Sequence, residues 1–413
     1  MLNQLDLLII SDLHAHSGDP RKSNAPSYYS TNSVYATPGT NPLVEIPALI
    51  RKAGLPVDWI VCPGDLSDKA DASAQKIAWE HLESIRIEVG AKKLIGTTGN
   101  HDIDSRRALP DFDPKSALQQ LNPDFPISLP CYVPNDRVYV DRFWSNNFVV
   151  IPFADFDCTL LILNSCAFHG YSSDVKVPPK EHLRGKIGPL TLAAIKTATA
   201  NLQTRLNVLL VHHHLIKIPF LDDNDSLMVG SNILLDILKS TGKQWFVMHG
   251  HEHAPYLMYS DADFFAPVVL SAGSVAAKTW RVKGGHARNQ IHHVSIPLSK
   301  IEPAGVRVFG RVTSWTWTFE NGWKEATGDG GIPYKSGFGY RFDGADMRDR
   351  IVAKAQSASP GLLPWAEVLR DYPKLEYIVP PDRDALISLL EGQGIRFEFD
   401  TFGVPTRLEW RIV

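Results

Sequence analysis

The chain has 413 residues, 44% of them hydrophobic and 21% charged, which is the balance of an ordinary globular protein with a sizeable core. Its 42 Lys and Arg against 45 Asp and Glu give a net charge of −3, which argues against nucleic acid as an obligatory partner. No apolar run approaches the roughly 20 residues that span a bilayer, and no secretion signal is recognisable. We therefore expect a cytoplasmic protein without a membrane span. Free buried thiols are expected at Cys62 and Cys158, in or beside apolar runs.

The first hundred residues alternate short apolar runs with polar clusters. Residues 5–10 predict a strand, and the polar stretch 15–42 that follows it is too long for an ordinary connection, so we expect a loop over a site or a mobile segment. The next apolar periods predict a helix over 43–53, a strand over 58–62, a helix over 71–89 and a strand over 93–95. This order of strands and helices predicts an α/β core.

The middle of the chain interrupts this order and then resumes it. Residues 104–146 are rich in proline and poor in apolar periods, and we interpret them as an insertion that caps or flanks the site. The later predicted elements are strands over 148–153 and 158–163, a helix over 187–203, a strand over 206–211, a helix near 231–240, and strands over 245–248, 268–270 and 291–296. Together with the first hundred residues, they form a catalytic domain that we place at residues 1–325.

The last part of the chain predicts a separate appendage. Apolar alternation persists at 306–309 and 314–319, and the Gly-rich stretch 326–345 predicts a linker. Residues 346–413 predict a small accessory α/β unit, with a helix over 383–392 and strands over 395–400 and 406–412.

Five polar clusters each follow a predicted strand. They are Asp12-x-His14, Gly64-Asp65-x-x-Asp68, Gly99-Asn100-His101-Asp102, His212-His213-His214 and Gly250-His251-x-His253. In an open α/β sheet the strand ends converge on one edge, where ligands bind. A mixture of imidazole, carboxylate and amide without thiolate suits Mn²⁺, Fe or Zn²⁺ better than Mg²⁺ or Ca²⁺, and we expect Mn²⁺ first.

The clusters hold more ligands than one tetrahedral ion can take. Two divalent ions roughly 3.5–4 Å apart, bridged by one carboxylate and a hydroxide, would use them all. Such a pair holds a phosphoryl oxygen, lowers the pKa of the bridging water and stabilises an in-line displacement. The chemistry that this pattern favours is therefore phosphoester hydrolysis.

In this order, the five clusters resemble the calcineurin-like metallophosphoesterase family, and in particular its cyclic-nucleotide phosphodiesterase and nuclease-like branch. The resemblance covers roughly residues 5–300. It implies a β-sandwich flanked by helices, that is, an α/β (α+β) fold, with the small C-terminal unit as an appendage.

The resemblance also implies a role for each cluster residue. The first metal would be bound by Asp12, His14, Asp65 and His253, and the second by Asp65, Asn100, His213 and His251, with Asp65 as the bridge. His101 would act beside the leaving-group oxygen as proton donor or phosphate stabiliser, and Asp68 would orient it. Asp102 would fix the loop.

The chain departs from the family pattern after the fourth cluster, where Leu215 stands in place of the proline of many relatives. By spacing we favour His213 over His212 as the ligand. His214 would face the substrate or be solvated. The insertion at 104–146 is expected to reshape the substrate cleft.

Other aromatic and histidine residues have simpler explanations than ligand binding. The 15–42 loop contains Tyr28, Tyr29 and Tyr35. We expect these side chains to anchor the loop rather than to stack on a substrate ring. Trp315, Trp317 and Trp323 alternate with polar residues. A strand buried on one face explains this pattern better than an aromatic platform that stacks on bases. Structural or surface positions are expected for His286, His292 and His293.

We predict a dinuclear-metal-dependent phosphodiesterase that cleaves nucleotide-type phosphodiesters by attack of the metal-bridging hydroxide. The expected partners are a phosphoester substrate, with nucleotides and nucleic acids among the candidates, and a protein partner or a second copy bound through residues 346–413. One alternative is a nuclease subunit that acts with a partner protein. Another is a non-catalytic scaffold that recruits partners through the same C-terminal unit, but the complete ligand set favours catalysis.

Overall fold

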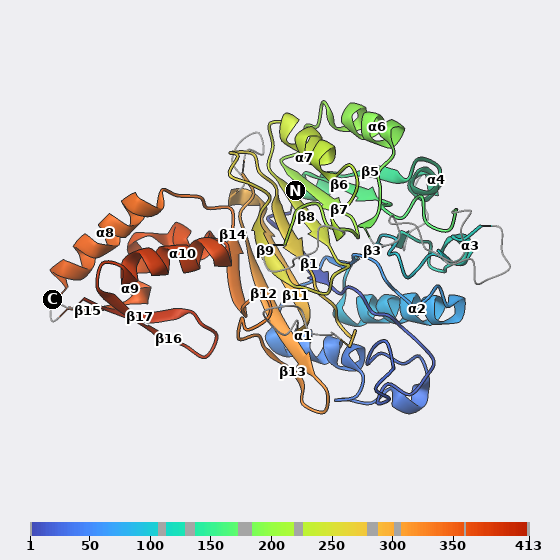
Figure 1. Ribbon diagram of the computed structural model, residues 1–413, viewed down its shortest axis with the longest axis horizontal. Helices are drawn as coiled ribbons and strands as arrows, with labels where there is room; N and C mark the ends of the chain where they lie inside the picture. Colours follow the sequence, from blue (N-terminus) through green and yellow to red (C-terminus); the bar gives the residue numbers. More distant parts are fainter. Residues whose placement is uncertain are drawn as a thin grey trace.

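The computed structural model describes residues 2–105, 113–128, 137–171, 184–218, 226–278, 288–300, 307–358 and 361–410. Two β-sheets lie face to face with helices on their outer sides, and a smaller unit with its own sheet extends from one end (Figure 1). The predicted α/β sandwich flanked by helices, with a C-terminal appendage, is confirmed. Among the described helices, none combines the length and apolarity needed to cross a membrane.

The first sheet has eight strands in the order β13-β12-β11-β1-β2-β3-β4, with β14 also paired to β12. Its strands are β1 (Gln4–Ile9), β2 (Trp59–Cys62), β3 (Lys93–Gly96), β4 (Ile127–Ser128), β11 (Asn289–Pro297), β12 (Gly310–Thr318), β13 (Gly322–Glu325) and β14 (Lys335–Phe338). Strands β1, β2 and β3 are parallel, so their carboxyl ends lie at the same edge. The other pairings in this sheet are antiparallel.

The second sheet has six strands in the order β5-β6-β7-β8-β10-β9. They are β5 (Phe148–Phe153), β6 (Cys158–Leu163), β7 (Leu206–Leu210), β8 (Trp245–His249), β9 (Tyr256–Tyr259) and β10 (Val268–Ser271). Strands β6, β7, β8 and β10 are parallel. The carboxyl ends of β7 and β8 therefore bring the fourth and fifth polar clusters to one edge.

Successive side chains of the second sheet point alternately to its two faces, and each face packs into a different apolar layer. Val208 and Phe246 belong to the core between the sheets, whereas their neighbours Leu209 and Val247 pack under the outer helices. Both faces are buried, which explains why these strands read as continuous apolar runs. The helices are α1 (Ile46–Ala53) and α2 (Ala72–Val89) beside the first sheet, and α6 (Pro189–Thr199) and α7 (Ser231–Ser240) on the second (Figure 1).

The described parts of the predicted insertion close one side of the sandwich. They contain α3 (Ser116–Gln119), β4 and α4 (Arg137–Asn146). Strand β4 extends the first sheet beyond β3, and α4 packs against β5 at the edge of the second. Phe143 of α4 is fully buried in the core that the two sheets share. The segment thus flanks the sandwich, and its effect on the substrate cleft stays a prediction.

The boundary of the C-terminal unit differs from the sequence prediction. Residues 335–338, in the predicted Gly-rich linker, form β14 and pair with β12 of the main sheet. Apolar alternation predicted a strand at 306–309. Residues 307–309 lie outside any strand, and the strand β12 begins at Gly310. The short strand β9 was not predicted.

The C-terminal unit has an apolar core of its own. Its elements are α8 (Gly344–Ser357), β15 (Leu362–Pro364), α9 (Trp365–Asp371), α10 (Pro380–Glu391), β16 (Ile395–Phe399) and β17 (Pro405–Trp410). In the described part of the chain, the short 3-10 helices are η1 (Ser33–Tyr35), η2 (Pro42–Glu45), η3 (Ala154–Phe156), η5 (Leu298–Lys300) and η7 (Pro373–Tyr377). The unit is held to the main domain where Arg311 of β12 forms an ion pair with Glu376 and Gly339 N–H donates to the Tyr259 hydroxyl at 3.0 Å.

Candidate metal centre

The five polar clusters meet at the carboxyl ends of parallel strands from both sheets. Backbone hydrogen bonds join the clusters directly: the Asp12 N–H donates to Gly64 O at 3.1 Å and the Gly250 N–H to His212 O at 3.1 Å. The loops that carry the side chains are therefore fixed by main-chain contacts as well as by the strands before them. Side chains of clusters that are far apart in the sequence therefore lie close enough together to bind the same metal ions.

One group of ligand atoms matches the first predicted metal site. His14 Nε2 lies 2.9 Å from His253 Nε2 and 3.5 Å from Asp65 Oδ2, and His253 Nε2 lies 3.5 Å from Asp12 Oδ1. Asp12, His14, Asp65 and His253 all place one ligand atom within 4.8 Å of one another. Two imidazole nitrogens and two carboxylates around one point are a donor set for a transition-metal ion.

A second group of side chains gathers around Asn100 and the same Asp65 oxygen. His212 Nε2 is 3.5 Å from Asp65 Oδ2 and 3.0 Å from Asn100 Oδ1. His251 Nδ1 is also 3.0 Å from Asn100 Oδ1. Asp65 Oδ2 thus stands between the two groups, as a bridging carboxylate would.

His212, and not the predicted His213, faces the Asp65 and Asn100 oxygens. His212 Nδ1 contacts the Pro63 carbonyl at 2.8 Å, which fixes the ring with Nε2 directed at those oxygens. His213 Nδ1 lies 2.7 Å from Ser165 Oγ and 3.9 Å from Cys166 Sγ. One ring atom of His213 lies within 4.8 Å of ligand atoms of His212 and His251. Of these two adjacent rings, it is His212 that contacts both the Asp65 and the Asn100 oxygens.

His214 does not lie in solvent. Its side chain is fully buried, with the His249 ring 4.4 Å away. The expectation of a solvated residue is therefore wrong, and a position toward the substrate stays a prediction.

The backbone at the centre adopts conformations that most residues avoid. Left-handed φ angles between 46° and 84° occur at Asp12, His14, Asp65, His251 and His253. Such angles cost energy for residues with a Cβ and cluster at functional sites. Neighbouring glycines make room, since a Cβ on Gly99 would overlap Asp65 Oδ1 and one on Gly250 would overlap Asp12 Oδ2.

Comparison with known proteins agrees with this arrangement. The family model of the calcineurin-like phosphoesterases matches residues 5–275. The chain belongs to this family. A second model, wHTH-Calcineurin_assc, matches residues 336–391 and so covers most of the C-terminal unit. A search of curated proteins finds no match.

Solved structures with a similar fold share little sequence with this phosphoesterase. A dimetal phosphatase from Danio rerio is 13% identical, with 76% of this chain and 99% of that chain covered and a TM-score of 0.44. PhoD is 8% identical, with 82% of this chain and 70% of PhoD covered and a TM-score of 0.45. A purple acid phosphatase from yellow lupin (Lupinus luteus) is 11% identical, with 75% of this chain and 51% of that chain covered and a TM-score of 0.44.

The burial and charge of the side chains at the phosphoesterase centre fit bound cations. Asp12 and Asp65 are 0% and 1% exposed. Burial raises the pKa of Asp65 well above its usual value, whereas at Asp12 the effect of burial is outweighed by the hydrogen bond from His253, which lowers the pKa. Burial also lowers the pKa of His212 to about 4, so this ring is neutral and can donate a lone pair at neutral pH. The donor set fits two divalent ions, which the family uses.

His101 and Asp68 form the predicted pair beside the ligands. His101 Nδ1 lies 3.1 Å from Asp68 Oδ1, and its ring is 4.6 Å from the His14 ring. Burial lowers the pKa of His101, but the Asp65 and Asp68 carboxylates outweigh it and raise the pKa above the usual value. His101 therefore holds its proton more firmly than a free imidazole does. Asp102 accepts the Ser67 and Gly99 N–H groups at 3.2 and 2.9 Å, which fits its predicted role in fixing the loop.

The simpler explanations given for the other aromatic and histidine residues hold within the described chain. Trp315 and Trp317 are buried, and Trp323 donates to the Pro42 carbonyl. Tyr29 is buried and contacts His81, while Tyr28 packs against Trp317. His292 and His293 are buried and hydrogen-bonded, Cys62 and Cys158 are buried free thiols, and His286 lies outside the described residues. Sequence reasoning missed Ser165, which holds His213, because no metal-ligand pattern includes a serine.

Proposed function

We propose that this calcineurin-like phosphoesterase hydrolyses phosphodiesters of the nucleotide type with two divalent ions. The observation that carries the proposal is the position of Asp65 Oδ2, 3.5 Å from both His14 Nε2 and His212 Nε2. One carboxylate oxygen between two separate groups of nitrogen and oxygen ligands is the arrangement of a dinuclear centre.

The ligand sets differ from the sequence prediction at one position. The first ion would be held by Asp12, His14, Asp65 and His253, and the second by Asp65, Asn100, His212 and His251. Imidazole, carboxylate and amide donors support Mn²⁺ as the first ion to test, with Fe and Zn²⁺ next. When bound, the ions would acidify a water and polarise the phosphoryl oxygens.

The side chains around the ions have distinct tasks. As the bond between phosphorus and the leaving oxygen breaks, His101 would donate its proton to that oxygen. Asp68 would keep the ring oriented through Nδ1 and stabilise its charged form, so the donor would be Nε2. The backbone N–H of His101 also donates to Asp65 Oδ1 at 2.8 Å, which ties the loop that carries the proton donor to the bridging carboxylate.

The preference for a diester rests on the resemblance of the His212-His213-His214 and Gly250-His251-x-His253 clusters to those of cyclic-nucleotide phosphodiesterases. The same pair of ions can hydrolyse monoesters, so the substrate class needs a direct comparison. Metal-stripped protein reloaded with Mn²⁺ should cleave bis-p-nitrophenyl phosphate faster than p-nitrophenyl phosphate. A faster reaction with the monoester would overturn the diester preference and leave the metal centre intact.

His101→Ala separates catalysis from metal binding. We expect turnover to fall roughly 10²–10⁴-fold while two ions per chain remain bound, because the imidazole donates a proton and does not hold a metal. Lys69→Ala is the matched control, since Lys69 is exposed and contacts the same Asp68 at 3.6 Å. Loss of metal from His101→Ala would show that His101 is a ligand. Absence of turnover by the wild-type protein with two ions bound would favour the scaffold alternative.

A further inference from the structure

The sheet of the C-terminal unit ends in an open edge. Its order is β15-β17-β16, and among the described residues no strand pairs with the other side of β16. Figure 1 shows β16 at the outer border of the unit. A strand with unpaired N–H and C=O groups is a template for pairing with another chain.

The neighbouring strands show which groups of β16 face that edge. The Trp410 N–H donates to Gly361 O at 2.8 Å, on the β15 side, so the peptide groups of Trp410 point away from β16. Trp410 stands opposite Ile395. In an antiparallel pair, the groups of Ile395 then point away from β17, toward the open edge, and those of Phe397 do the same two residues later.

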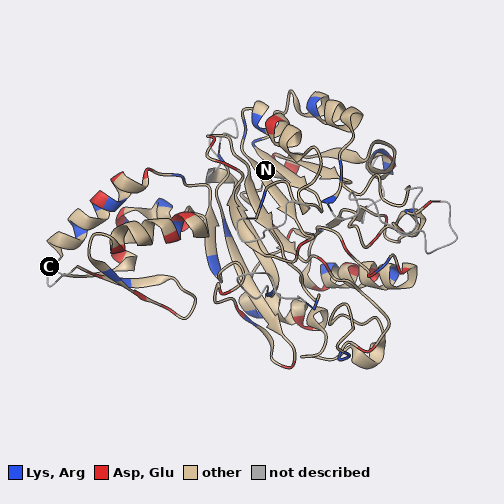
Figure 2. Ribbon diagram, viewed as in Figure 1, with Lys and Arg blue, Asp and Glu red and all other residues tan. Residues whose placement is uncertain are grey.

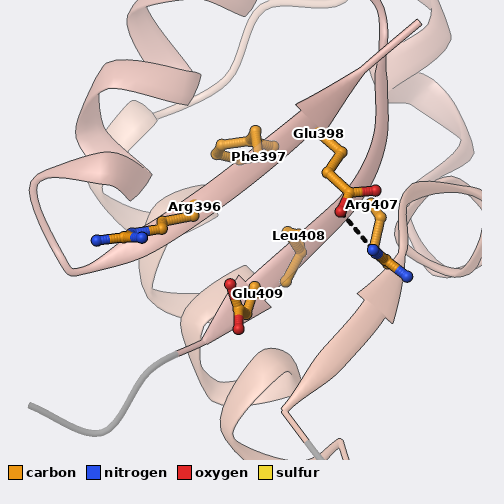
Figure 3. Close-up of a pocket in the computed structure, with 6 residues that line it drawn as sticks. All are labelled: Arg396, Phe397, Glu398, Arg407, Leu408 and Glu409. Carbon is orange, nitrogen blue, oxygen red and sulfur yellow. Dashed lines mark hydrogen bonds and ion pairs between the residues drawn. The ribbon is translucent and has the colours of Figure 1, made fainter.

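The side chains of β16 divide between two faces by the same alternation. The Phe397 ring is half-buried and lies 6.1 Å from the Trp365 ring, on the side of the helices. Arg396 and Glu398 lie on the other face, where Glu398 forms an ion pair with Arg407 of β17 (Figure 3). Arg396 is exposed and makes no ion pair within the described residues.

We propose that β16 pairs with β16 of a second copy of this chain, antiparallel and about a two-fold axis at Phe397. The two three-stranded sheets would then form one six-stranded sheet across a homodimer. The outward N–H and C=O groups of Phe397 would bond those of Phe397 of the second copy. Arg396 of each chain would stand directly opposite Glu398 of the other.

The charge order of β16 selects this register. Charged side chains usually protect an edge strand, because pairing with another strand tends to place like charges together. Here a positive and a negative residue flank Phe397 at equal distance, so two-fold pairing about Phe397 sets opposite charges across both positions. The edge is thus complementary to itself.

The charge of the whole unit supports a protein strand as the occupant. Residues 340–410 contain twelve Asp and Glu against nine Lys and Arg. The two signs are interleaved along α8 and α10 (Figure 2). A surface that binds a nucleic-acid backbone needs an excess of basic side chains, whereas the net charge of this unit is negative.

Charge reversal tests the pairing on the full chain. Sedimentation equilibrium over a range of micromolar concentrations should show a dimer for the wild-type protein. Arg396→Glu and Glu398→Arg each place like charges at both symmetry-related positions, and each should raise the dimer dissociation constant roughly tenfold or more. An equimolar mixture of the two variants restores opposite charges at both positions and should return to the dimer.

The mixture distinguishes lost pairing from lost folding, because a misfolded variant would not be rescued by another. Arg407→Glu is the matched control: it breaks the ion pair with Glu398 within one chain but leaves the residues at the two-fold axis unchanged, so it should remain dimeric. A monomeric wild-type protein, a mixture that stays monomeric, or an Arg407→Glu variant as dissociated as Arg396→Glu would each overturn the proposal.

Discussion

The metal centre and the C-terminal unit place their charges in opposite environments. Asp12 and Asp65 are almost completely buried, whereas the Glu398 and Arg407 side chains of the C-terminal sheet are 61% and 44% exposed. A buried carboxylate destabilises the fold unless a cation or hydrogen bonds compensate it. An exposed ion pair contributes little to folding. Charges in the centre are therefore coupled to metal binding, and those of the C-terminal sheet can change without loss of the fold.

The backbone shows the same contrast. Five residues of the metal centre have left-handed φ angles, while in the described residues from 344 to 410 only glycines do. Strained backbone persists only where the surroundings fix it, and it is common at functional sites. The centre combines strain with burial, so small changes there should have large effects. The C-terminal unit should tolerate the same changes.

Removal of the bridging carboxylate should have the largest effect. Asp65→Ala removes the one oxygen that faces both groups of ligands, so we expect the loss of both ions and of detectable turnover. Metal content by mass spectrometry and hydrolysis of the diester measure the two losses. Glu398→Ala is the control in the C-terminal unit and should keep both ions. Retention of two ions by Asp65→Ala would contradict the bridge.

A single methyl group tests the packing difference between the two regions. Gly99→Ala would make its Cβ overlap both Asp65 Oδ1 and the backbone N of Asp65, which cannot move aside. We expect metal affinity and turnover to fall at least tenfold. Gly392→Ala, at the end of α10, meets no atom closer than 3.5 Å and should leave both unchanged. Equal losses of metal affinity and turnover in the two variants would contradict the expected difference in packing between the metal centre and the C-terminal unit.

The two adjacent histidines after β7 should differ in the same way. His212→Ala removes a ligand next to Asp65 and should abolish binding of the second ion. His213→Ala removes a ring held by Ser165 and should weaken metal affinity roughly 10–100-fold, as expected for a residue that supports the ligands. Isothermal titration with Mn²⁺ measures both changes. The reverse order of effects would restore His213 as the ligand.

This pair also marks a limit of sequence reasoning. The clusters could be predicted because each follows an apolar strand and parallel strands end at one edge. The choice between His212 and His213 depends on which face each residue takes at the strand end, and β7 is buried on both faces, so its sequence carries no alternation to set that phase. The contact of His212 with the Pro63 carbonyl directs its Nε2 at the Asp65 and Asn100 oxygens, which supports the proposal of His212 as the ligand.

Part of the predicted Gly-rich linker is a strand for a related reason. Composition predicted a linker at 326–345, but a Cβ on Gly337 would collide with the backbone of Glu376 and Tyr377. This glycine allows β14 and the C-terminal unit to approach closely. Glycine in a sequence signals either freedom or close contact, and the distinction needs the tertiary partner, which lies about forty residues away in this chain.

The smallest expected effect concerns a buried histidine outside both regions. His292 Nδ1 lies 2.8 Å from Ser314 Oγ and Nε2 lies 2.9 Å from Ala272 O, and burial lowers its pKa to about 4. The folded protein keeps this ring neutral, whereas the unfolded chain protonates it near pH 6.5. Its contribution to stability is therefore complete above pH 6.5 and is lost as the pH falls from 6.5 toward 4.

His292→Gln should remove this dependence, because the amide can donate to Ala272 O and accept from Ser314 but does not titrate. Between pH 7 and pH 5 the wild-type protein should lose about 2 kcal/mol more unfolding free energy than the variant. Urea denaturation at both pH values, on protein freed of metal so that ligand protonation does not differ, measures the difference. Parallel pH profiles would mean that burial does not lower the pKa of His292 in the folded protein, because Nδ1–H and Nε2–H of a charged ring could donate to Ser314 Oγ and Ala272 O.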